Sequence, residues 1–247
     1  MNTRKIRYSF LCAVMAACLL LSACSGGVTL TNGENGCLDK KNGVNYHYAS
    51  LCYEPVKIGD SYGNIGGDYE LFEIPGVDPL RWIAGEDNNI LYSDEITLPT
   101  LLEMEPHLIR ICTTESSGVE LCRLTDDAAV LSVAEAFSSG EKLDYPSTAA
   151  SEKYKVKFAS DKYEHMYYTL TYLEYSSDLI VDEVNHGRYF LYNSFDRVFI
   201  PIGDEIHRAI EGTVGSDTVT EADTEASNAS TDVGTEAESN REAVTPV

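Results

Sequence analysis

Carboxylates are the most abundant side chains in this sequence that could do chemistry. Neighbouring acids, such as Asp94-Glu95, Asp126-Asp127 and Asp182-Glu183, could supply the acid and the base of a glycosidase. However, the 247-residue chain contains 40 Asp and Glu against 18 Lys and Arg, so adjacent acids are expected by chance. These pairs therefore indicate an exposed, solvated surface more strongly than they indicate catalysis.

Histidines and nucleophiles give no recognisable catalytic or metal-binding pattern. Motifs for zinc hydrolases, serine hydrolases, phosphate loops and calcium loops are absent from the sequence. None of the five histidines has a partner at the spacing that metal ligands require, although folding could gather His186, His207 and nearby acids. We therefore predict no cofactor, no metal and no catalytic residue. The net charge of −22 also excludes nucleic acid as a partner, because phosphate binding needs clustered cations.

Cys24 follows an ordered arrangement of basic and apolar residues at the start of the sequence. Arg4, Lys5 and Arg7 precede an uncharged apolar stretch at residues 10–21, and the segment ends in Leu-Ser-Ala-Cys at residues 21–24. The apolar stretch is too short for a permanent membrane span and is typical of a signal peptide.

This order of features, confined to residues 1–24, resembles the lipobox signal peptide of bacterial lipoproteins. The resemblance implies cleavage after Ala23 and attachment of lipid, with palmitate-type acyl chains, to Cys24. The protein would then be held on the cell membrane by its lipid and face the extracytoplasmic side, in the cell envelope. An ordinary signal peptide with an incidental cysteine, or a retained anchor, is the alternative.

The four remaining cysteines are an even number in an exported chain, which favours structural disulfides. If residues 116–118 form a three-residue hairpin loop with its glycine in the left-handed conformation, Cys112 faces Cys122 across the hairpin. We therefore predict a Cys112–Cys122 disulfide, with Cys37 and Cys52 as the second pair. Free thiols are the alternative.

A tyrosine-rich segment at residues 165–175 is the best candidate for binding. Its even-numbered residues from 166 to 172 are apolar and are expected to face the core. The opposite face would present His165, Tyr167 and Tyr175, which could stack on sugar rings or anchor a protein partner. The alternative is that tyrosine simply suits a half-exposed strand.

The elements that must position these residues are mostly strands. Strands are predicted where aromatic and β-branched residues lie between turn residues, at 69–74, 90–92, 108–112, 120–124, 154–159, 167–175 and 189–192. A helix is predicted at 126–139, capped by Thr125 or Asp126 and ended by Gly140, with a shorter one at 204–210 and a single helical turn at 78–82. The fold class is therefore α+β, with a mainly antiparallel sheet and one or two packed helices.

Composition divides the chain into four parts. We expect a signal peptide at 1–23, a lipidated flexible tether at 24–36, the α+β domain at 37–212, and a disordered acidic tail at 213–247. The function predicted from these features is a membrane-anchored, non-catalytic binding module with a protein or glycan partner in the envelope. An envelope hydrolase that uses scattered carboxylates, with or without a metal, is the alternative.

Overall fold

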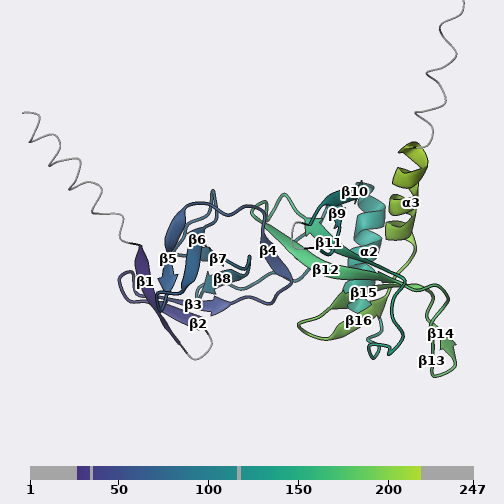
Figure 1. The fold of residues 1–247 in the computed structure, drawn as a ribbon, viewed down its shortest axis with the longest axis horizontal. Helices are drawn as coiled ribbons and strands as arrows, with labels where there is room; N and C mark the ends of the chain where they lie inside the picture. The colour runs from purple at the N-terminus through teal and green to yellow at the C-terminus, as the bar shows by residue number, and fades with distance from the viewer. Residues whose placement is uncertain (1–26, 34–35, 116–117, 218–247) are drawn as a thin grey trace, which may run out of the picture. The chain divides into compact units, whose positions relative to one another are not determined.

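The computed structural model describes residues 27–33, 36–115 and 118–217, with side chains up to residue 213 (Figure 1). The predicted signal peptide, the lipidation site Cys24 and most of the predicted acidic tail lie outside these residues. The chain divides between Ile210 and Glu211 into two units, and both sheets and the helix α2 belong to the first. No helix in the described part of the chain is long and apolar enough to span a membrane.

Seven short strands close into a barrel in the order β1-β2-β3-β8-β7-β6-β5. They are β1 (Val28–Asn32), β2 (Gly36–Asp39), β3 (Val44–Tyr48), β5 (Ser61–Ile65), β6 (Tyr69–Glu73), β7 (Trp82–Gly85) and β8 (Ile90–Ser93). The barrel closes where β1 pairs in parallel with β5, and every other neighbouring pair is antiparallel. Gly63 permits this closure, because a Cβ there would lie 1.9 Å from the carbonyl oxygen of Val28.

The barrel interior is filled by side chains that alternate along its strands, as a small barrel requires. Its fully buried members are Leu30, Cys37, Tyr46, Leu71, Ile83 and Leu91. The prediction of a flexible tether at 24–36 is therefore wrong for residues 28–32. They form β1, and its Leu30 is completely buried in this core.

A buried polar network links strands of the barrel that are not hydrogen-bonded neighbours. The carboxylate of Asp39, at the end of β2, accepts a 2.6 Å hydrogen bond from the Tyr62 hydroxyl of β5. The Tyr46 hydroxyl lies 3.3 Å from that of Tyr62 and donates a 2.7 Å bond to the carbonyl of Pro79. This satisfies polar groups that would otherwise be costly to bury.

The second sheet has the order β10-β9-β11-β12-β15-β16, and β4 also pairs with β12. Its strands are β4 (Tyr53–Pro55), β9 (Leu108–Cys112), β10 (Glu120–Leu124), β11 (Glu152–Ala159), β12 (Met166–Glu174), β15 (Tyr189–Asn193) and β16 (Val198–Pro201). All its strand pairs are antiparallel. A separate hairpin is formed by β13 (Ile180–Val181) and β14 (Val184–Asn185).

Helix α2 (Asp127–Ser139) packs on this sheet (Figure 1). It begins where Asp126 accepts a 2.8 Å bond from the backbone N–H of Ala129, and Gly140 ends it. Val130, Val133 and Ala134 are buried in the main core, which also contains the even-numbered residues from 166 to 172 of β12. The predictions of this helix and of the core face of β12 are confirmed.

The structure agrees with the predicted fold class in its main elements, which are antiparallel strands and helices. The described chain is mostly β-strand with two helices and antiparallel sheets. The prediction of one sheet with packed helices is incomplete, because it missed the closed barrel. Helix α3 (Glu205–Asp217) also extends past the predicted end at residue 210.

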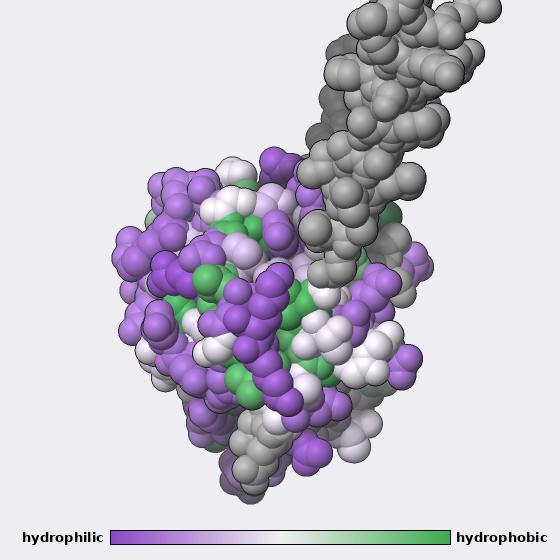
Figure 2. Space-filling view, turned by 90° about the vertical axis from the view of Figure 1, so that its left-hand side faces the viewer, coloured by the Kyte–Doolittle hydropathy of each residue, from purple (hydrophilic) through white to green (hydrophobic). Residues whose placement is uncertain are grey.

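Figure 2 shows one face of the molecule, on which hydrophilic residues dominate and hydrophobic areas are small. This agrees with the solvated surface that the many carboxylates indicate.

Candidate functional site

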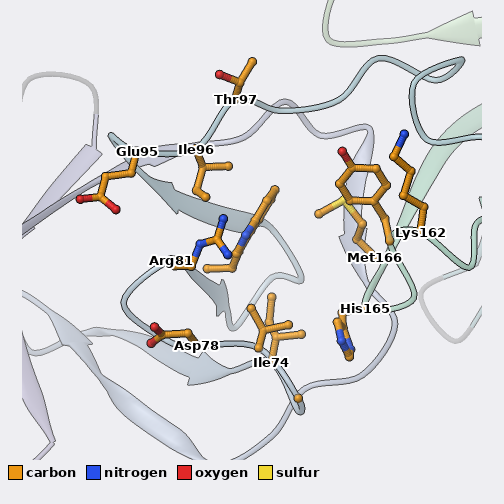
Figure 3. Close-up of a pocket in the computed structure, with 13 residues that line it drawn as sticks. Ile74, Asp78, Arg81, Glu95, Ile96, Thr97, Lys162, His165 and Met166 are labelled. Atoms are coloured by element: carbon orange, nitrogen blue, oxygen red, sulfur yellow. The ribbon is translucent and has the colours of Figure 1, made fainter.

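A cavity of about 410 Å³ opens among three segments that are distant in the sequence. They are residues 74–82, which lead into β7, residues 95–97, which follow β8, and residues 162–166, which lead into β12. The volume lies in the range typical of small-molecule sites. The cavity is therefore the candidate functional site (Figure 3).

The first segment is held in place by turn chemistry that the sequence predicts. The backbone N–H groups of Arg81 and Trp82 donate to the carbonyl of Asp78 at 2.9 and 3.2 Å, which forms the predicted helical turn at 78–82. The Asp78 carboxylate also accepts a 3.0 Å bond from the N–H of Leu80. This turn places Arg81 and Trp82 at the cavity.

The third segment is fixed by backbone bonds on both sides. The N–H of Met166 donates to the carbonyl of Tyr163 at 3.1 Å, and the carbonyl of His165 accepts a 2.9 Å bond from the N–H of Val56. The imidazole of His165 packs against Gly76, where an added Cβ would lie 2.7 Å from the ring carbon Cε1. Gly76 has a φ of +82°, so this contact depends on glycine for both its conformation and its size.

Apolar side chains form the walls of the cavity. Ile74 and Met166 are buried, while Trp82 and Tyr163 are partly buried and pack against the main core. The Trp82 ring lies 6.4 Å from that of Tyr92, measured between centroids. The rings of Trp82 and Tyr163 are thus anchored in the core and form part of the cavity wall.

Charged groups of both signs line the same cavity. The Lys162 ammonium is neutralised by Glu105, 2.6 Å away, and it also donates to the carbonyl of Glu103 at 3.1 Å. The hydrogen bond to Glu105 raises the pKa of Lys162. In contrast, the guanidinium of Arg81 makes no ion pair with any residue that the structure describes.

The structure brings one of the predicted binding residues to this cavity and buries the other two. His165 lines the cavity, with its Nε2 atom 3.3 Å from Glu164. Tyr167 is 7% exposed and Tyr175 is 2% exposed, so the predicted open tyrosine face is wrong for both. Tyr167 is buried because β12 lies inside its sheet and is covered on both faces, whereas Tyr175 lies just after the end of β12.

Different neighbours cover the two tyrosines. The cationic groups of Arg110 and Lys157 each lie 5.5 Å from the centroid of the Tyr167 ring, and the Tyr167 hydroxyl accepts a bond from Arg110. Tyr175 packs edge-on against Phe190, with the ring centroids 5.6 Å apart, in a third hydrophobic cluster. Both rings are therefore structural.

The predicted disulfides are not formed, and this prediction is corrected. Cys37 lies in the barrel core, whereas Cys52 lies in the main core. The register of the hairpin differs from the predicted one already next to its loop, where Thr113 bonds to Val119 and Cys112 faces Glu120. A β-bulge between Glu120 and Cys122 then places Cys122 opposite Ile111. Burial, with a smaller contribution from a nearby carboxylate, raises the pKa of the Cys37 thiol to about 12, which disfavours the reactive thiolate.

Histidines and acids do not assemble into a metal site in the described residues. His207 pairs with Glu174, with 3.0 Å between Nδ1 and the carboxylate, and stacks on Tyr189 at 4.9 Å between centroids. His186 instead lies in the loop after β14, where its backbone N–H bonds to the carbonyl of Leu179. The lipidation site Cys24 lies outside the described residues.

Sequence reasoning missed Arg81, Trp82 and Tyr163 as members of a site. One signal was available, since Trp82 is the single tryptophan of the chain and follows an arginine in a predicted turn. Comparisons of the chain with protein-family models, with curated proteins and with solved structures gave no match.

Proposed function

We propose that this protein is a membrane-anchored lipoprotein whose described domain binds a component of the cell envelope without catalysis. The observation that carries the proposal is the 410 Å³ cavity lined by Trp82, Tyr163 and Arg81. Anchored aromatic rings beside a few polar groups are the usual construction of a ligand site.

The lining supports binding more than catalysis. Catalysis by a nucleophile needs a hydroxyl or thiol within hydrogen-bond reach of a base. Neither the Thr97 nor the Tyr163 hydroxyl is hydrogen-bonded to His165 or to a carboxylate of the described residues. We therefore propose that the cavity provides surfaces for contact and hydrogen bonding, with the lining carboxylates Asp78 and Glu95 as acceptors, and that a bound component leaves it unchanged.

The location of the domain follows from the signal-peptide resemblance. Lipid on Cys24 would hold the protein at the membrane, and the acid-rich chain would remain solvated on the extracytoplasmic side. Cys24→Ala is expected to abolish the lipid-modified N-terminal peptide in mass spectra and to release the protein from membranes. Cys18→Ala, within the same segment, is the matched control and should leave both unchanged.

The binding proposal can be tested with the intrinsic fluorescence of Trp82, because this is the chain's single tryptophan. The protein, purified in detergent, is titrated with soluble envelope fragments of two kinds, oligosaccharides and short peptides. We expect a saturable change in Trp82 emission with at least one fragment, which mass spectrometry then recovers unmodified.

Two tyrosine variants localise the signal. Tyr163→Ala should weaken binding, whereas Tyr145→Ala, which removes a half-exposed ring outside the cavity, should not. The proposal fails if no fragment gives a saturable response, or if the bound fragment is converted to product.

A further inference from the structure

Arg81 is the most informative polar group of the cavity. The described domain is rich in acids, yet the Arg81 guanidinium is exposed and has no ion-pair partner among the described residues. Figure 3 shows it between Glu95 and Asp78, with His165, Met166 and Lys162 across the cavity. Because Lys162 is paired with Glu105, Arg81 is the lysine or arginine of the lining that has no ion-pair partner among the described residues and is available to an anionic group.

The chemistry of that anion follows from the guanidinium and from the surrounding charge. A guanidinium offers parallel N–H donors that match a carboxylate in a two-bond geometry. A densely charged polyanion would be repelled by a chain of net charge −22. A ligand with isolated carboxylates fits both conditions.

The remaining lining groups suit a sugar ring. Trp82 and Tyr163 are half-exposed rings that can stack on the C–H face of a pyranose, while Asp78, Glu95 and Thr97 can accept hydrogen bonds from sugar hydroxyls.

An extended peptide is less suitable, because peptides commonly bind by adding a strand to an open sheet edge. The strands that reach the cavity, β7 and β12, each lie between two neighbouring strands, and their lining residues Trp82 and Met166 are paired with Tyr92 and Pro55. Neither strand therefore offers a whole free edge to a peptide.

We infer that the cavity binds a glycan segment that bears a carboxylate, with the carboxylate on Arg81 and a sugar ring against Trp82 and Tyr163. The inference rests on the proposed binding function and narrows its ligand class. The structural feature it depends on is the position, beside two anchored rings, of a guanidinium that has no ion-pair partner among the described residues.

The test compares three probes by calorimetry and by Trp82 emission. They are a disaccharide of glucuronic acid and N-acetylglucosamine, its uncharged methyl ester, and the neutral disaccharide of N-acetylglucosamine. We expect the acid to bind roughly fivefold to tenfold more tightly than the ester at low salt, as an accessible charge-assisted pair allows. Salt should reduce this ratio.

Variants assign the preference to its residue. Arg81→Gln should lower the acid-to-ester ratio to about 1 while ester binding is retained, and Arg81→Lys should give an intermediate ratio because it keeps the charge without the planar donors. Arg197→Gln, which changes an exposed arginine outside the cavity, should keep the full ratio. Thermal unfolding of each variant verifies that it is folded. If Arg81→Gln does not fold, the comparison of wild type with Arg81→Lys provides the test.

The outcomes separate this inference from the function it rests on. If the acid and the ester bind equally, or if the preference survives Arg81→Gln, the carboxylate assignment is wrong. If peptides or neutral sugars still bind in a manner sensitive to Tyr163→Ala, the proposed binding function stands. If no probe or fragment binds, both are overturned.

Discussion

Asp39 provides the sharpest test of how the barrel is stabilised. The residue is completely buried, and its carboxylate accepts four hydrogen bonds. The donors are the Tyr62 hydroxyl, the Asn42 side chain, and the backbone N–H groups of Lys41 and Asn42, at 2.6, 2.7, 2.9 and 3.0 Å. Asp39→Asn removes the charge and, if its amide oxygen keeps the backbone bonds, places a donor where Oδ2 accepts from both Tyr62 and Asn42.

The magnitude follows from the number of bonds that are lost. A hydrogen bond to a charged group contributes about 1.5 to 3 kcal/mol. The amide of Asp39→Asn can retain both backbone bonds but loses at least one charged side-chain bond, and its easier burial offsets part of that loss. We expect a loss of about 2 kcal/mol in unfolding free energy, which corresponds to a fall of about 4 to 8 °C in Tm for a domain of this size.

The pH dependence gives a second, independent signature. Burial raises the pKa of Asp39, but the hydrogen bonds from Tyr62, Asn42 and the backbone outweigh it, so the pKa is lowered overall. A lowered pKa means that this stabilisation is complete above the unfolded pKa of about 3.9 and is lost as the pH falls through the folded value. The difference between wild type and Asp39→Asn should therefore shrink below about pH 4.

Urea denaturation, followed by circular dichroism and Trp82 emission, measures these effects. Tyr62→Phe should cost about 1.5 kcal/mol, and the double variant should lose less than the sum, because both changes remove the same bond. Asp68→Asn, an exposed acid in a turn of the same barrel, is the control and should stay within about 0.5 kcal/mol of wild type. The reasoning is refuted if Asp39→Asn matches this control, or if the two single effects simply add.

Three further predictions concern other parts of the domain. Cys37 and Cys112 are buried thiols with raised pKa values, so without reductant they should alkylate slowly in the native protein and completely in guanidinium; mass spectra that show them oxidised would contradict this. Asp126→Ala should cost about 1 kcal/mol by removing the α2 cap, and Asp127→Ala less; equal losses would show that the cap bond contributes little. Glu54→Gln should cost about 2 kcal/mol, because Glu54 is the carboxylate partner of two lysines on β11; an unchanged urea midpoint would show that the lysines find other partners.

Sequence patterns predicted the second sheet better than the barrel, for a physical reason. Strands such as β11 and β12, of eight and nine residues, contain aromatic or β-branched residues in runs long enough to show a period of two. The barrel strands have at most five residues and include glycine, asparagine and histidine, as in β3 and β5. Their pattern becomes informative only when the neighbouring strands are known.

The errors at candidate site residues have equally local causes. The predicted loop is two residues too short, since Glu120 and not Cys122 faces Cys112, and the bulge that follows leaves Cys122 opposite Ile111. Loop length and bulges set the register of a hairpin, and the sequence pattern around Cys112 and Cys122 indicated neither. Tyr167 faces away from the main core along β12 as expected, but a strand with neighbours on both sides and cover on both faces leaves no face open. Tyr175 follows the end of β12 and is buried against Phe190 instead. Similarly, Arg81 and Tyr163 meet only through tertiary folding, which spacing along the chain does not reveal.

The proposed lipid anchor is attached close to β1, the strand that closes the barrel. Three residues separate Cys24 from Val28, so the Cα atom of a lipidated Cys24 would lie within about 14 Å of this strand. A protease that cuts before residue 28 would shed an intact domain. A cut within 28–32 would instead break β1, the strand that pairs with both β2 and β5 and so closes the barrel. Release from the membrane and loss of the barrel would then occur together.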